Sequence, residues 1–150
     1  MRVRAHIATS VVLGGFLYLA FRSLPMAIAA FLSGVLIDLD HVLECYINFG
    51  RKFNIWKTIE KCEDCSLEKA YLFLHSYELL AIYALAVYWY QLGDIWYGIG
   101  IGVAVHMILD SIFNCYHPNG LFFFKRWKTG FNYSKIVRIE DQKKKRRVHR

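Results

Sequence analysis

The stretch Ile37-Asp38-Leu39-Asp40-His41 places two carboxylates and an imidazole near the end of an apolar run that begins at about Pro25. A charge inside lipid is costly, so an ionisable residue within an apolar run indicates a functional site by default. Three other apolar runs carry such groups too: His6 in the first, His75 and Glu78 in the third, and His106 and Asp110 in the fourth. We expect these groups to meet inside a membrane and to bind a divalent metal ion.

The composition favours a membrane protein. Of the 150 residues, 56% are hydrophobic and 17% are aromatic, and the mean hydropathy is +0.26. A soluble chain of this length can bury a core, but its helices then show polar stripes. In this chain the apolar runs are broken mainly by histidine and carboxylate positions, which favours helices surrounded by lipid.

Four runs approach the length of about 20 mostly apolar residues that a spanning helix needs. They cover residues 5–21, 25–49, 70–92 and 95–116. We therefore predict an all-α polytopic membrane protein whose four transmembrane helices form a bundle. Residues 1–125 are expected to form this metal-binding domain, and residues 126–150 a basic cytoplasmic tail at the lipid interface.

The basic residues predict the orientation of this bundle. Four crossings put residues 1–4, 51–69 and 117–150 on one side of the membrane, and all 19 Lys and Arg residues except Arg22 lie there. By the positive-inside rule, both termini are expected in the cytoplasm. The run Lys143-Lys144-Lys145-Arg146-Arg147 is expected to attract anionic lipid headgroups. No other feature of the sequence is typical of nucleic-acid-binding modules, so we expect no nucleic-acid partner.

In this topology nearly all the ionisable groups fall in the cytoplasmic half of the bilayer. With a rise of about 1.5 Å per residue, only His106 comes close to the midplane. Helical spacing adds facing information, since residues three or four apart share a face. Asp40 points away from the face of Asp38 and His41 in a regular helix, so either it supports the ligands from behind or the helix is distorted there. The expected metal ligands are His6, Asp38, Asp40, His41, His75, His106 and Asp110, and Asp40 and Glu78 are the candidates for a catalytic base.

Imidazole together with carboxylate suits zinc, manganese or iron(II). We expect zinc, with the other two as alternatives, and one to three ions. A site with several ions can activate water and hold a phosphoryl group. The competing interpretations are a buried polar network, a metal carrier or sensor, and a haem-binding electron carrier. Carboxylates are not usual ligands of haem iron, which disfavours the last of these.

Two further features carry weaker predictions. Cys62 and Cys65 form a single Cys-x2-Cys pair in a charged connector. A structural zinc site normally has four ligands, so two ordinary loop cysteines are the favoured interpretation. Gly98 and Gly102 share a helix face, and small residues let membrane helices approach closely. If the chain forms a homodimer, this glycine face is the expected contact.

The order of these motifs resembles the YdjM-type family of prokaryotic membrane-bound metal-dependent hydrolases. That family has an early histidine, a Pro-Asp-Leu-Asp-His-like motif, a Thr-His-Ser motif and a late His-x3-Asp. This chain has His6, Asp38-Leu39-Asp40-His41, His75-Ser76 and His106-x3-Asp110 in the same order, over about residues 5–125. Ile37 and Leu74 stand where the family usually has Pro and Thr, and the family's His-Arg-Gly stretch is not evident.

The resemblance carries functional expectations that the motifs alone do not. The YdjM-type family is distantly similar to the zinc-dependent phospholipase C superfamily, whose members cleave phosphoesters. The resemblance therefore implies a hydrolase that acts on a phosphoester, such as a membrane lipid or a lipid-linked phosphate. It also implies a location in the cell membrane of a prokaryote, which is the inner or plasma membrane.

Overall fold

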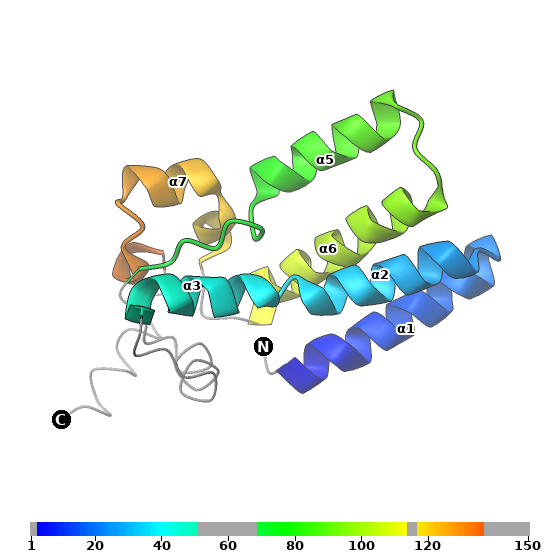
Figure 1. Ribbon diagram of the computed structural model, residues 1–150, viewed down its shortest axis with the longest axis horizontal. Coiled ribbons are helices and arrows are strands. Elements are labelled where there is room, and N and C mark those ends of the chain that lie inside the picture. The colour runs from blue at the N-terminus through cyan, green and yellow to red at the C-terminus, as the bar shows by residue number, and fades with distance from the viewer. Residues whose placement is uncertain (1–2, 51–68, 114–116, 137–150) are drawn as a thin grey trace.

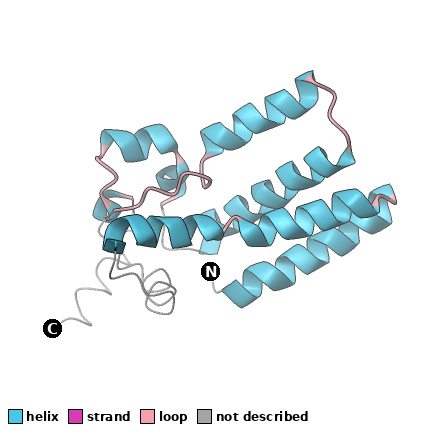
Figure 2. Cartoon of the chain, viewed as in Figure 1, coloured by secondary structure: helices cyan, strands magenta, loops and turns pink. Residues whose placement is uncertain are grey.

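The computed structural model describes residues 3–50, 69–113 and 117–136, and every regular element in these ranges is a helix (Figures 1 and 2). This confirms the prediction of an all-α protein. The Cys62–Cys65 pair and the polybasic run near the C-terminus lie outside the described residues. The elements are α1 (Val3–Phe21), α2 (Leu24–Leu36), α3 (Leu39–Phe49), α5 (Tyr77–Trp89), α6 (Asp94–Phe113), the 3-10 turn η2 (Pro118–Leu121), α7 (Phe123–Lys128) and the 3-10 turn η3 (Tyr133–Lys135).

Among the residues that the structure describes, three segments are long and apolar enough to cross a membrane: Arg4–Phe21, Leu24–Asn48 and Asp94–Phe113. The second of them contains both α2 and α3, which follow one another almost in line (Figure 1). Large apolar side chains point outward from these segments, and Val12 and Phe16 are 72% and 64% exposed. Such broad apolar surface is typical of contact with lipid. The three segments indicate a membrane protein, as the composition predicted.

The predicted helix over residues 70–92 is wrong for residues 70–76, which form an irregular segment before α5. The helix begins only at Tyr77, where the Ser76 hydroxyl accepts a hydrogen bond from the Leu79 N–H. Such a side-chain cap is typical of a helix start. The shortened α5 has 13 residues, about 20 Å of helix, which is less than the roughly 30 Å of a bilayer core.

The helix α2 packs against both α1 and α6 (Figure 1). Its contact with α6 depends on glycine, because a Cβ atom on Gly98 would collide with the Met26 carbonyl oxygen, and one on Gly102 with that of Ala30. The prediction that these glycines form a packing surface is confirmed. Their assignment to a homodimer contact is wrong, since α2 of the same chain covers this face.

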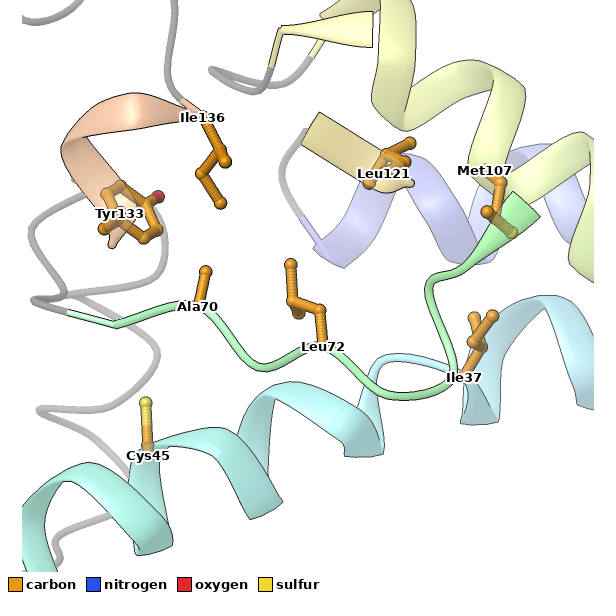
Figure 3. Packing of buried hydrophobic residues seen from close by; sticks show 8 residues of the cluster. All are labelled: Ile37, Cys45, Ala70, Leu72, Met107, Leu121, Tyr133 and Ile136. Carbon is orange, nitrogen blue, oxygen red and sulfur yellow. The ribbon is translucent and has the colours of Figure 1, made fainter. Parts of the chain in front are cut away.

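A second cluster of buried residues lies around the irregular segment. Figure 3 shows Ala70 and Leu72 of this segment between Cys45 of α3 on one side and Leu121, Tyr133 and Ile136 on the other. The C-terminal elements therefore pack onto the helices and share a core with them. The expected boundary between residues 125 and 126 falls inside α7, and Arg126 itself is completely buried.

Candidate metal centre

The structure brings the predicted ligands together in two adjoining groups of three. One group is His6, His106 and Asp110, and all three residues are buried. The other is Asp38, His41 and His75, of which His75 is buried and the other two are half-buried. Within each group one ligand atom per residue lies within 4.8 Å of the others. Residues from α1, α2–α3, the irregular segment and α6 thus meet at a single place in the fold.

Asp110 connects the two groups. Its Oδ1 atom lies 3.1 Å from Nε2 of His6, and its Oδ2 atom lies 3.4 Å from Nε2 of His106. The same Oδ2 atom is 3.8 Å from Nε2 of His75 in the other group. A second connection runs from His106 to Asp38, whose Oδ1 atom is 3.3 Å from Nε2 of His106. The two groups therefore form one continuous site.

A break in the second apolar segment helps to place these groups. The helix α2 ends at Leu36 and α3 begins at Leu39, so Asp38 stands at the junction. This distortion is one of the two alternatives left open for Asp40. Because of this junction, two acidic residues that are two positions apart contact different partners. Asp38 faces His106 in α6, while Asp40 contacts the irregular segment.

The rings of His41, His75 and His106 each contact an oxygen atom at Nδ1, and Nε2 of His75 and of His106 lies near Asp38 and Asp110. Nδ1 of His106 lies 2.7 Å from the carbonyl oxygen of Gly34, so Nδ1 carries a proton and donates it to that oxygen. Nδ1 of His75 contacts Asp40 at 3.2 Å, and Nδ1 of His41 contacts Glu44 at 3.3 Å. Histidines that bind metal almost always have such a partner behind them.

His75 carries the clearest candidate ligand atom for a cation. The ring is 1% exposed, and its Nε2 atom has no hydrogen-bond partner among the residues that the structure describes. A buried ring nitrogen that is left without a partner costs free energy, and binding to a divalent ion would remove that cost.

Asp40 and Glu44 lie behind the ligands and belong to neither group of three. Besides the His75 ring, Asp40 Oδ2 accepts hydrogen bonds from the N–H groups of Leu74 at 2.7 Å and His75 at 3.3 Å. Glu44 accepts one from the Tyr71 N–H at 2.8 Å. Asp40 was predicted as a ligand or base, and the structure places it as a support for His75.

Glu44 was not predicted as a site residue, because a carboxylate near the end of an apolar run resembles a solvated charge at the interface. It is in fact 1% exposed. Its position four residues after Asp40 puts both carboxylates on one face of α3. That spacing is the sequence feature by which it could have been found.

Glu78, the other predicted base, also belongs to neither group. Its carboxylate accepts hydrogen bonds from the N–H groups of Phe123 at 2.9 Å and Phe124 at 3.2 Å, and from the Ser76 hydroxyl at 2.8 Å. A carboxylate at a helix N-terminus satisfies free N–H groups and is favoured by the helix dipole. Glu78 therefore joins the start of α5 to the start of α7.

The short histidine–carboxylate distances also fit ion pairs between protonated imidazoles and the aspartates. One observation argues against full protonation: the rings of His6 and His106 are stacked with their centroids 4.0 Å apart. Two imidazolium cations at this distance would repel each other. The mixture of imidazole and carboxylate is a donor set that zinc, manganese or iron(II) can use.

No protein-family model, curated protein or solved structure matches this chain. The resemblance to the YdjM-type family therefore remains a prediction.

Proposed function

We propose that this chain is a membrane-embedded, metal-dependent hydrolase that cleaves a phosphoester in a membrane lipid or a lipid-linked phosphate. The observation that carries the proposal is the convergence of four histidines and two aspartates in one site, with the Nε2 atoms of His6, His75 and His106 close to Asp110. The family resemblance supports phosphoester chemistry in particular.

The two groups fit two divalent ions. His6 and His106 would bind one ion, Asp38, His41 and His75 the other, and Asp110 is placed to contact both. Zinc is the expected metal, with manganese and iron(II) as alternatives. Bound ions would supply Lewis-acid catalysis and activate water for attack on phosphorus. Asp40 and Glu44 would keep the ligating rings of His75 and His41 in orientation.

A cavity beside the site supports a lipid substrate. It has a volume of about 260 Å³ and is lined by apolar side chains of α2, α5 and α6, among them Leu80, Tyr83 and Val103. Its wall also includes Ile37 and Leu74, the chain neighbours of Asp38 and His75. The cavity is large enough for part of a hydrocarbon chain, and its wall includes the chain neighbours of two candidate metal ligands.

The topology proposed with this function has four crossings and both termini in the cytoplasm of a prokaryotic cell. The fourth crossing combines α5 with the irregular residues before it. An extended chain advances about 3.3 Å per residue, so residues 70–76 add the length that the short helix lacks. The basic residues at the two termini and between α3 and α5 support this orientation.

The test is a hydrolysis assay on purified protein reconstituted in vesicles. We expect release of phosphate or a phosphorylated headgroup from a lipid phosphate, dependent on added zinc, manganese or iron(II). The Asp38→Ala, His106→Ala double variant, with its helical content unchanged, serves as the control and should be inactive. If the native protein binds metal but cleaves neither lipid phosphates nor soluble phosphodiesters, it is a metal-binding protein without this activity.

A further inference from the structure

Arg126 is an arginine in the interior of the protein, with an exposed fraction of 0%. Its guanidinium group is occupied by main-chain carbonyl oxygens. Nη2 donates to Leu72 at 2.8 Å, and Nη1 donates to His75 at 2.9 Å and to Gly120 at 3.2 Å. Arginine is almost never fully buried unless its charged group is paired. Two of the three acceptors belong to the irregular segment that carries His75.

This segment needs partners from outside for its backbone. Residues 70–76 form no helix, and Leu72 has a φ of 43° in the left-handed region. Non-helical backbone at membrane depth is tolerated only where other parts of the protein satisfy its polar groups. Such partners therefore determine where the segment lies.

Those partners stand on two sides. The carboxylates of Asp40 and Glu44 in α3 accept hydrogen bonds from its N–H groups, and Arg126 in α7 donates to its carbonyl groups. The segment is thus held between acidic side chains and a buried cation. The contact at the His75 carbonyl acts on the same residue whose ring is held by Asp40.

We propose that Arg126 is a positioning residue for the metal centre. By binding the carbonyl groups of Leu72 and His75, it keeps Nε2 of His75 directed toward Asp38 and Asp110. This inference rests on the metal-binding part of the proposed function and does not require hydrolysis. A planar guanidinium with separate nitrogen atoms can reach three carbonyl groups at once, whereas the single ammonium of lysine cannot hold the same arrangement.

The experiment compares Arg126→Lys with native protein in detergent or vesicles, using zinc and a competing chromophoric chelator. The substitution keeps the charge, and circular dichroism should show unchanged helical content. We expect zinc affinity to fall roughly 10- to 100-fold at one of two sites, the range found when a residue behind a metal ligand is removed. Cobalt(II) bound in place of zinc should show a changed visible spectrum. Lys125→Ala in the same helix is the matched control and should bind both ions normally.

A double-mutant cycle separates positioning from general destabilisation. If Arg126 acts through His75, zinc binding by the His75→Ala, Arg126→Lys double variant should equal that of His75→Ala alone. Independent, additive losses would overturn the proposal, as would native zinc affinity in folded Arg126→Lys. For Arg126→Ala, which removes the group entirely, added guanidinium chloride at low concentration should restore zinc binding. Absence of this rescue in a folded variant would also count against the proposal.

These outcomes are separable from the fate of the proposed function. Native protein that binds two zinc ions but cleaves no phosphoester would remove the hydrolase and leave the role of Arg126 intact. If the native protein hydrolyses a phosphoester but folded Arg126→Lys binds zinc normally, the hydrolase proposal stands and the role of Arg126 is overturned. Native protein that binds no divalent metal would overturn both.

Discussion

At the scale of single residues, the important feature is the oxygen atom that contacts Nδ1 of a ligating histidine. The rings of His41, His75 and His106 each contact an oxygen atom at Nδ1, from Glu44, Asp40 and the Gly34 carbonyl group. Such contacts fix the ring orientation and raise the basicity of the other nitrogen. The candidate metal centre therefore depends on residues that would not themselves touch a metal ion.

Asp40→Asn tests this dependence. The amide keeps the size of the side chain but loses the charge that favours Nδ1–H of His75 as donor, so the ring is less firmly oriented. We expect metal affinity to fall about 10- to 100-fold, measured by competition with a chelator. Asp94→Asn is the control, because Asp94 is an exposed carboxylate in the first turn of α6. Equal affinities in the two variants would contradict the role given to Asp40.

The residues at the site were predictable from sequence to an unequal degree. His6, Asp38, His41, His75, His106 and Asp110 stand out because ionisable groups are rare in apolar runs. Glu44 and Arg126 did not stand out, since each lies near the end of an apolar run where a charge normally reaches water. Their burial depends on how α3, α7 and the irregular segment pack, and local sequence does not encode that packing.

At the scale of elements, the bundle depends on the close contact between α2 and α6. Helices in a membrane gain little from hydrophobic burial against each other, so small residues that permit close approach are important. Gly98 and Gly102 provide this approach, and the same contact brings Asp38 of the α2–α3 junction beside His106 of α6. Packing and ligand placement are therefore linked.

Gly98→Ala should destabilise the bundle. The new Cβ atom would collide with the Met26 carbonyl oxygen, and overpacking of this kind typically costs about 1–3 kcal/mol. Thermal unfolding in detergent is the measurement. Gly15→Ala is the matched control, because a Cβ atom there meets open space within helix α1. An undiminished unfolding temperature for Gly98→Ala would show that α2 and α6 are not in close contact.

Filling the cavity between α2, α5 and α6 should affect lipid substrates selectively. Leu80→Trp puts a large side chain into the cavity wall, whereas Leu85→Trp changes an exposed position on the same helix. We expect Leu80→Trp to reduce cleavage of a long-chain lipid phosphate at least tenfold and to leave cleavage of a small soluble phosphodiester unchanged. If both substrates are cleaved at native rates, the hydrocarbon chain binds elsewhere.

The element that sequence reasoning placed least well is the run over residues 70–92. Its apolar residues predict a continuous helix, because they resume directly after His75 and Ser76. The interruption comes from competition, since the carboxylates of α3 take N–H groups that a helix would use internally. The Ser76 cap was a local sign of the true start. A capping residue within an apolar run therefore predicts the start of a helix better than the length of the run does.

At the scale of the whole molecule, the chain combines apolar outer surfaces with a polar interior site. In the described part of the chain, three segments are long enough to cross a membrane, and the shorter helix α5 lies along α6 (Figure 1). The C-terminal elements cover one end of the bundle and share a core with the irregular segment. We expect the basic termini to remain on the cytoplasmic side.

Cysteine labelling tests this orientation. In a cysteine-free background that replaces Cys45, Cys62, Cys65 and Cys115 by alanine, Arg22→Cys should react with a membrane-impermeant maleimide in intact cells. Lys128→Cys should react only after the membrane is opened, because α7 lies at the other end of the bundle. Both positions are exposed. The reversed pattern, or labelling of both positions in intact cells, would contradict the four-crossing topology.

If the buried histidines and aspartates bind divalent metal, elemental analysis of the purified protein will detect it. Protein purified in detergent is compared with the Asp38→Ala, His106→Ala double variant, which removes one ligand from each group and must retain its helical content. We predict near-stoichiometric zinc, manganese or iron in the native protein, at up to two ions per chain, and loss of that metal in the variant. Native protein that contains no such metal, even after incubation with each ion, would show that these residues form a metal-free network of ion pairs.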